Sequence, residues 1–239
     1  MDLRLAMMAG SDIPIPECQM TLHQPTIKEI SMIGEKDFFV GAQLLCVNKS
    51  MYIKDESLLD DTTNFQIFMT VVTDKQSADK KQSVFKVLTL LFPSAKVIMT
   101  PRALMFNFEG ANVIIDENNF EILQGVFKEV FCLSASGQEA FNPGNDAAKE
   151  IAEKLMRARQ RVAAQKGEND ASVFSQYLSI LTVGLNSMSL QNLLDLTIYQ
   201  LYDLVERYML YVNWDLDVRT RLAGGKPDSR PDNWMKIIH

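Results

Sequence analysis

Three short β-rich runs decide the fold class: Lys96-Val-Ile-Met-Thr100, Ala103-Leu-Met-Phe-Asn107 and Asn112-Val-Ile-Ile-Asp116. Pro101 and Gly110 separate these runs. Short apolar runs bounded by such residues are typical of strands joined by tight turns. We therefore predict a small antiparallel meander inside a helix-rich chain, which makes this an α+β protein.

The segments on both sides of the meander have helical spacing. Residues 64–73 and 83–92 before it, and 118–132 after it, repeat apolar side chains every three or four positions. Such spacing gives each helix one apolar face. The β-branched residues of 64–73 leave a strand as the alternative for that segment.

The first part of the chain contains both strand and helix signals. Residues 3–8 and 17–22 flank a segment with two prolines, and we expect two short strands there. Thr26 with Glu29 three residues later is a capping-box pattern, which predicts that a helix begins at Thr26. A second helix is expected to begin near Glu35.

The C-terminal part is predicted to be entirely helical. Helical spacing covers residues 146–166, 171–185 and 190–222, and Thr197 is a candidate cap inside the last segment. Glycines and a proline in residues 134–145 predict a boundary. We divide the chain into an α+β region (1–140), a helical region (146–223) and a linker with a C-terminal anchor peptide (224–239).

Composition and charge limit the functional classes. Hydrophobic residues make up 47% and charged residues 23% of the 239 residues, which is typical of a globular protein. The net charge of −6 disfavours general binding to nucleic acid. The N-terminus does not resemble a secretion signal, and no apolar run approaches the ~20 residues of a membrane span, so we expect a cytoplasmic protein without membrane contact.

No residue pattern indicates catalysis, a metal or a cofactor. The three cysteines lie far apart, and the two histidines are His23 and the terminal His239. These five residues do not have the paired spacing of zinc ligands, and neither histidine is placed by sequence as the base of a catalytic nucleophile. We therefore expect no catalytic residues, no metal ligands and no cofactor. An enzyme that uses carboxylates converging only in the fold is the third alternative.

The strongest candidate site is the anchor peptide. Trp234, Met235, Ile237 and Ile238 follow a Gly/Pro linker, and large apolar residues rarely occupy a free terminus unless something binds them. We predict that these four residues bind protein, together with Tyr199 and Tyr211 from the aromatic-rich helix before them. Docking on this chain and docking on a partner both remain open at this stage.

A locally basic segment supports an alternative function. Arg157, Arg159 and Arg161 lie in residues 149–166, where the basic residues outnumber the acidic ones. They form a candidate nucleic-acid contact for a nucleic-acid-associated or regulatory protein. The acidic chain and the lack of aromatic residues between the arginines instead favour a solvated or protein-contacting face.

Several segments resemble proteins from the morphogenesis regions of tailed bacteriophages, particularly tail assembly chaperones. The resemblance lies in Pro25-Thr-Ile-Lys-Glu-Ile30 with Ile33-Gly-Glu35 and Phe38-Phe39, in Leu196-Thr-Ile-Tyr-Gln-Leu-Tyr-Asp203 and in Asp232-Asn-Trp-Met235. It implies a non-enzymatic protein of the host cytoplasm that binds the tape measure protein or tail tube subunits during assembly. A homo-oligomer is a further option. The large N-terminal α+β region departs from the smaller, mostly helical chaperones of this kind.

Overall fold

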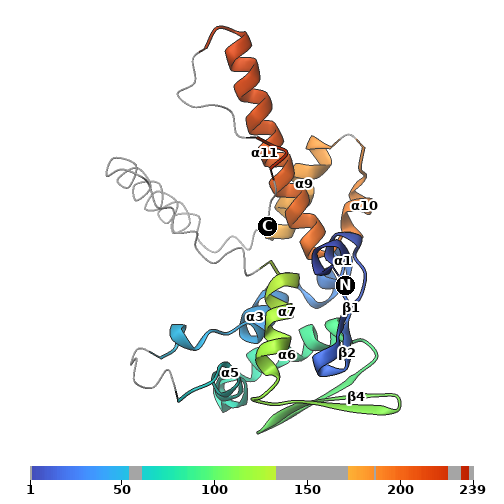
Figure 1. The fold of residues 1–239 in the computed structure, drawn as a ribbon, viewed down its shortest axis with the longest axis vertical. Helices are drawn as coiled ribbons and strands as arrows, with labels where there is room; N and C mark the ends of the chain where they lie inside the picture. The colour runs from blue at the N-terminus through green and yellow to red at the C-terminus, as the bar shows by residue number, and fades with distance from the viewer. Residues whose placement is uncertain (1, 54–60, 133–171, 186, 226–232, 237–239) are drawn as a thin grey trace.

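The computed structural model describes residues 2–53, 61–132, 172–185, 187–225 and 233–236. Within these ranges the chain is helix-rich and contains two small antiparallel sheets, so the predicted α+β class is confirmed (Figure 1). The sheets belong to the N-terminal part, and the elements among the described residues of the C-terminal part are helices.

The N-terminal segment begins with a helix where a strand was expected. Residues Leu3–Ala9 form α1, so the strand prediction for residues 3–8 is wrong. The Asp2 side chain accepts from the Leu5 amide, and Gly10 ends the helix with a φ of +65°. These two caps provide hydrogen bonds for backbone groups at the helix ends. The pattern of apolar residues contains no signal for them. The first strand lies farther along, where β1 (Ile13–Ile15) pairs with β2 (Met20–Leu22).

The predicted helices of the N-terminal part are confirmed, with adjusted ends. The Thr26 capping box is present at the start of α2, and Thr63 rather than Asn64 caps α5. These helices are α2 (Ile27–Ile33), α3 (Glu35–Leu45), α5 (Asn64–Thr73), α6 (Ala78–Leu91) and α7 (Phe120–Val130). Short 3₁₀ turns add η1 (Pro16–Cys18), η2 (Lys49–Met51) and η3 (Lys75–Ser77).

The predicted meander is also confirmed. It consists of β3 (Lys96–Thr100), β4 (Ala103–Phe108) and β5 (Ala111–Ile115) in the order β3-β4-β5. Leu104 and Phe106 of the central strand are fully buried, and the Phe106 ring packs edge-on against Phe92 at 4.9 Å. One face of the sheet therefore covers the core beside α6.

A glycine permits the closest helix pairing in this core. A Cβ atom on Gly41 of α3 would lie 2.6 Å from the Ser83 carbonyl oxygen of α6. The two helix backbones approach closely because that atom is missing. Phe38, three residues before Gly41, packs edge-on against Phe131 at 5.4 Å, so the same face of α3 also contacts the end of α7.

The C-terminal helices are α9 (Val173–Gly184), α10 (Leu190–Leu194) and α11 (Ile198–Leu222). Thr197 forms the capping box of α11, which confirms the predicted internal cap. Gly224, with a φ of +88°, follows the end of α11. The Gly224 amide donates to the Arg221 carbonyl and the Gly225 amide to the Thr220 carbonyl, which caps the helix. In Figure 1, α11 projects away from the part that contains the sheets.

The N-terminal and C-terminal parts share one hydrophobic core, which extends from Met7 to Leu201. The Ile27 amide donates to the Leu196 carbonyl at 2.9 Å, and the Gln200 side chain donates to the Met8 carbonyl at 2.8 Å. The base of α11 is therefore fixed to the N-terminal part. The predicted boundary at 134–145 and the predicted helix at 146–166 lie outside the described residues.

Candidate protein-binding surface

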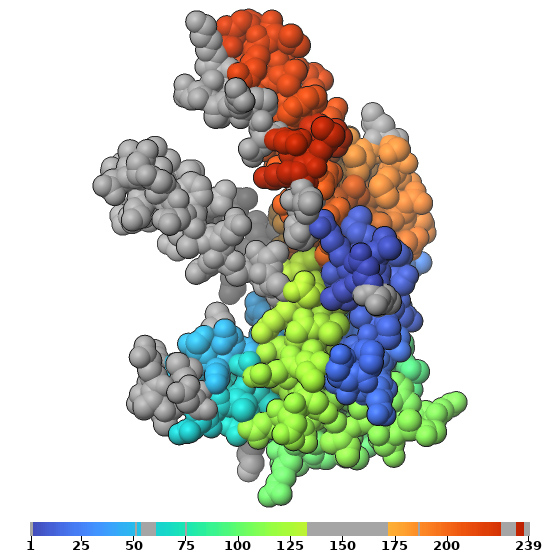
Figure 2. All heavy atoms as spheres, viewed as in Figure 1, coloured from blue at the N-terminus to red at the C-terminus, as the bar shows by residue number. Residues whose placement is uncertain are grey.

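The surface begins with the distal part of α11. Ile198, Tyr199 and Leu201 in its first turn are buried, whereas every residue of α11 after Leu201 is at least partly exposed. A helix of 25 residues is about 37 Å long. The helix packs against the core as far as Tyr208, and the part beyond it projects from the body (Figure 2).

The C-terminal tail packs on one side of this projecting helix. The Trp234 ring lies edge-on to the Tyr211 ring, with the ring centroids 5.6 Å apart, and its centroid is 6.3 Å from that of the Trp214 ring. Tyr211 and Trp214 are three residues apart, so they share a helix face, and their ring centroids are 6.2 Å apart. Three aromatic side chains from two distant segments thus form one cluster.

Arg207 fixes the backbone of the tail. Its Nη1 donates to the Trp234 carbonyl at 2.6 Å and to the Lys236 carbonyl at 2.8 Å. The tail is a tight turn at this point, in which the Lys236 amide donates to the Asn233 carbonyl and the Met235 amide to the Asn233 side chain. The described residues 233–236 therefore form a tight turn.

We call this group the aromatic tail site and define it as Arg207, Tyr211, Trp214, Trp234 and Met235. Tyr211 is 44% exposed and Met235 is 68% exposed. Tyr, Trp, Met and Arg are the residue types enriched in protein interfaces, because each offers a large contact area with a polar or polarisable group. The exposed parts of Tyr211 and Met235 are accessible to an apolar segment in the structure as it stands.

The structure brings together only part of the predicted set. Trp234, Met235 and Tyr211 meet in the aromatic tail site, whereas Tyr199 is 3% exposed and lies in the core, where burial raises the pKa of its phenol. Ile237, Ile238, Arg157, Arg159 and Arg161 lie outside the described residues.

Sequence reasoning missed Trp214 and Arg207. Both lie on the helix face of Tyr211, at spacings of three and four, so a helical wheel could have grouped them.

His23, the histidine among the described residues, lies between two carboxylates. His23 Nδ1 lies 3.0 Å from Asp12, and Nε2 lies 3.4 Å from Glu29. Partial burial, the largest single influence, acts to raise the pKa of Glu29, but hydrogen bonds from the Thr26 backbone and side chain and from His23 together lower that pKa. His23 thus joins the capping box of α2 to the loop before β1.

The cysteine thiols are protected. Burial is the main cause that raises the pKa of Cys46 and of Cys132 to about 12 each, and burial also raises the pKa of Cys18. A thiol with a raised pKa contains little of the reactive thiolate at neutral pH. These cysteines therefore have the environment of structural residues.

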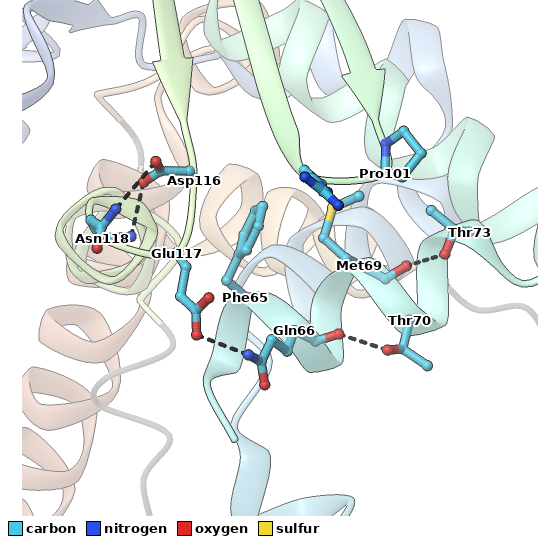
Figure 3. A pocket seen from close by; sticks show the side chains of 10 residues that line it. Phe65, Gln66, Met69, Thr70, Thr73, Pro101, Asp116, Glu117 and Asn118 are labelled. Carbon is cyan, nitrogen blue, oxygen red and sulfur yellow. Dashed lines mark hydrogen bonds between the residues drawn. The ribbon is translucent and has the colours of Figure 1, made fainter. Parts of the chain in front are cut away.

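A cavity of about 570 Å³ lies between α5, the β3–β4 turn and the segment before α7 (Figure 3). Its polar groups are largely engaged with each other: the Gln66 side chain donates to Glu117 at 2.9 Å, and Asp116 accepts from the Asn118 amide at 2.9 Å. In the part of the chain that the structure describes, no group of three or more His, Cys, Asp or Glu residues is placed to hold a metal ion.

Comparison with protein families connects the C-terminal part with phage proteins. Residues 166–239 match the family model of the YomV second domain. This match spans α9, α10, α11 and the aromatic tail site, and it associates the region with a phage-derived family. A search of curated proteins and a search of solved structures gave no match. None of the described helices is long and apolar enough to cross a membrane.

Proposed function

We propose that this chain is a non-enzymatic phage assembly protein that binds tail components, the tape measure protein or tail tube subunits, during virion morphogenesis in the host cytoplasm. The observation that carries the proposal is the position of the aromatic tail site on a projecting helix. The site also lies within the residues that match the phage-derived family, which supports a phage-specific role.

The binding mechanism is hydrophobic capture. An apolar segment of a tail component packs against the exposed edges of Tyr211 and Met235 and extends the cluster that Trp234 begins. Aromatic side chains bury a large area with few rotatable bonds, so they lose little conformational entropy when they bind. Capture covers the segment until it joins the tail, and it requires neither a cofactor nor a chemical step.

Co-expression with the tape measure and tail tube proteins of the same phage tests this function. The test variant lacks residues 226–239, and the matched control is Leu216→Ala, which changes a side chain that is 57% exposed on the other side of α11. We expect both proteins to remain folded, and the truncated chain should lose at most the helical circular dichroism signal of the end of α11. Only the truncated chain should lose recovery of a tail component. Equal recovery by the full and truncated chains would reject the binding role of the tail.

A further inference from the structure

The α9–α10 hairpin lies within a long uncharged stretch. Residues 171–194 contain no Asp, Glu, Lys, Arg or His, although 23% of the residues in the whole chain are charged. Charged side chains normally occupy the exposed face of a helix in a soluble protein, because they interact favourably with water. Their absence from two consecutive helices therefore needs an explanation.

Packing within the chain explains only one side of the hairpin. Four of its apolar side chains are buried: Phe174, Leu178, Leu181 and Leu193. Four others face solvent, with exposures of 81% for Val183, 49% for Leu190, 43% for Ile180 and 39% for Val173. Depletion of charge on an exposed surface is a mark of the central part of protein interfaces.

The exposed side of the hairpin is concave. Two adjoining hollows of about 310 and 400 Å³ share Ser175, Leu178 and Leu194, so they form one groove along α9. Leu190 and Leu194 of α10 form the opposite wall. The aromatic tail site uses neither α9 nor α10, and α9 lies beside the lower part of α11 (Figure 1).

The dimensions and lining of the groove fit a helix. The 12 residues of α9 are about 18 Å long, which corresponds to roughly three turns of a second helix. Ser175, Ser179 and Thr182 line the α9 wall with small side chains, so another backbone can approach closely. Helix-in-groove binding uses apolar anchors at spacings of three and four, which an apolar groove accepts.

The charges near the ends of the groove indicate which charge a bound partner should carry. Glu35 lines one end, where its carboxylate accepts from the Val173 amide at 2.6 Å. The exposed Asp195 directly follows Leu194 at the end of α10. Both charges are negative, and no Lys or Arg is among the described residues that line the groove. A ligand with basic residues at its ends complements this pattern.

We propose that this groove binds an amphipathic helix of a protein partner, with an uncharged apolar face toward α9 and α10 and with Lys or Arg at its ends. Acidic residues near the groove repel the anionic lipids that attract amphipathic surfaces, and a concave groove fits a row of side chains better than a lipid plane. This second binding site goes beyond capture by the aromatic tail site and does not require that the partner be a tail component.

A designed peptide tests the groove directly. The probe is a labelled 16-residue helix with leucines at alternating spacings of three and four and with lysines elsewhere, titrated with the full chain in a fluorescence anisotropy assay. We expect saturable binding that weakens at least tenfold in Val183→Glu and in Ser179→Glu, because the new carboxylate must be desolvated in the complex. Both positions are exposed, so the substitutions leave the core unchanged.

Two controls make the result specific. Ile114→Glu places the same charge on a side chain that is 52% exposed on the distant sheet and should leave the affinity unchanged. A second peptide with glutamates in place of the lysines should bind more weakly. No saturable binding, or equal affinities for Val183→Glu and Ile114→Glu, would overturn the proposal.

A vesicle assay separates the two classes of partner. Sedimentation with phosphatidylserine vesicles that depends on Val183 would identify a lipid surface instead and would also overturn the proposal. The peptide assay contains no tail component and uses the intact tail. Its failure is therefore distinguishable from failure of the capture function.

Discussion

Trp234→Ala tests the central feature of the candidate site, the docking of the tail on α11. The substitution removes the ring contacts to Tyr211 and Trp214 and leaves the tail with the two hydrogen bonds from Arg207. The chain contains only two tryptophans, so the variant retains Trp214 as its single indole. That residue is itself part of the docking surface and reports directly on the loss of the tail.

The expected effect is local and measurable. Aromatic pairs contribute about 0.5–1.5 kcal/mol each, so the two contacts of Trp234 stabilise the docked tail by about 1–3 kcal/mol. A loss of this size lowers the ratio of docked to undocked tail by roughly 5- to 150-fold. The core is unaffected because the tail contacts the projecting part of α11, and the thermal midpoint should change little.

Trp234→Phe is the matched variant, since it also retains only Trp214 but keeps an aromatic ring at position 234. We expect the Trp214 emission of Trp234→Ala to be red-shifted relative to Trp234→Phe, because the indole becomes more exposed to water. Hydrogen exchange at the Met235 and Lys236 amides should be faster in the alanine variant. Identical emission and exchange in the two variants would show that the tail does not dock in this way.

Three further predictions, two on substitutions and one on thiol reactivity, test the packing of the core. Gly41→Ala forces a Cβ to within 2.6 Å of a backbone oxygen of α6 and should cost about 1–3 kcal/mol, which lowers the thermal midpoint by roughly 2–12 °C. Gly125→Ala meets no atom within 4 Å and is the control. Gln124→Leu removes the side chain that donates to the backbone carbonyls of Leu45 and Val47 at the end of α3. It should lower the free energy of unfolding, measured in urea, by about 2–4 kcal/mol. An unchanged urea midpoint would show that these two hydrogen bonds do not stabilise the fold. Cys46 and Cys132, each with a pKa of about 12, should react with an aromatic disulfide at pH 8 only after denaturation, and rapid reaction of the native protein would contradict their burial.

Local signals in the sequence were sufficient for most of the fold. Pro101 and Gly110 mark both turns of the meander, and the Thr26 and Thr197 caps depend only on residues within three positions. Residues 3–8 were misassigned because a helix of seven residues is too short to show a clear period. Its stability comes from end caps and from packing against the rest of the chain, which a periodicity count does not include.

The candidate site was predictable only in part, because it joins residues that are distant in the sequence. An apolar terminal peptide indicates that something binds Trp234, but its spacing contains no information about where. The hydrogen bond between Arg207 and Trp234 connects positions 27 residues apart, across the end of α11. A contact of this kind depends on the path of the chain after the helix, which no periodic pattern specifies.

The projecting end of α11 depends mainly on local interactions. Arg219 pairs with Asp215 at 2.8 Å, and Arg221 pairs with Asp217 at the same distance. Exposed pairs at a spacing of four contribute about 0.3–0.5 kcal/mol each, and a helix segment without tertiary packing is marginally stable in water. The docked tail, at about 1–3 kcal/mol, equals or exceeds the sum of both pairs.

It follows that tail docking and the order of the helix end are coupled. The tail contacts Arg207, Tyr211 and Trp214, so it stabilises the helix beside and beyond Tyr208, which still packs against the core. A partner that extends the cluster over Tyr211 and Trp214 reinforces the same turns and adds to the stability of the helix. A partner that withdraws Trp234 removes that support from the turns around Tyr211 and Trp214. Capture by addition to the docked tail is therefore energetically favoured over capture by displacement of the tail.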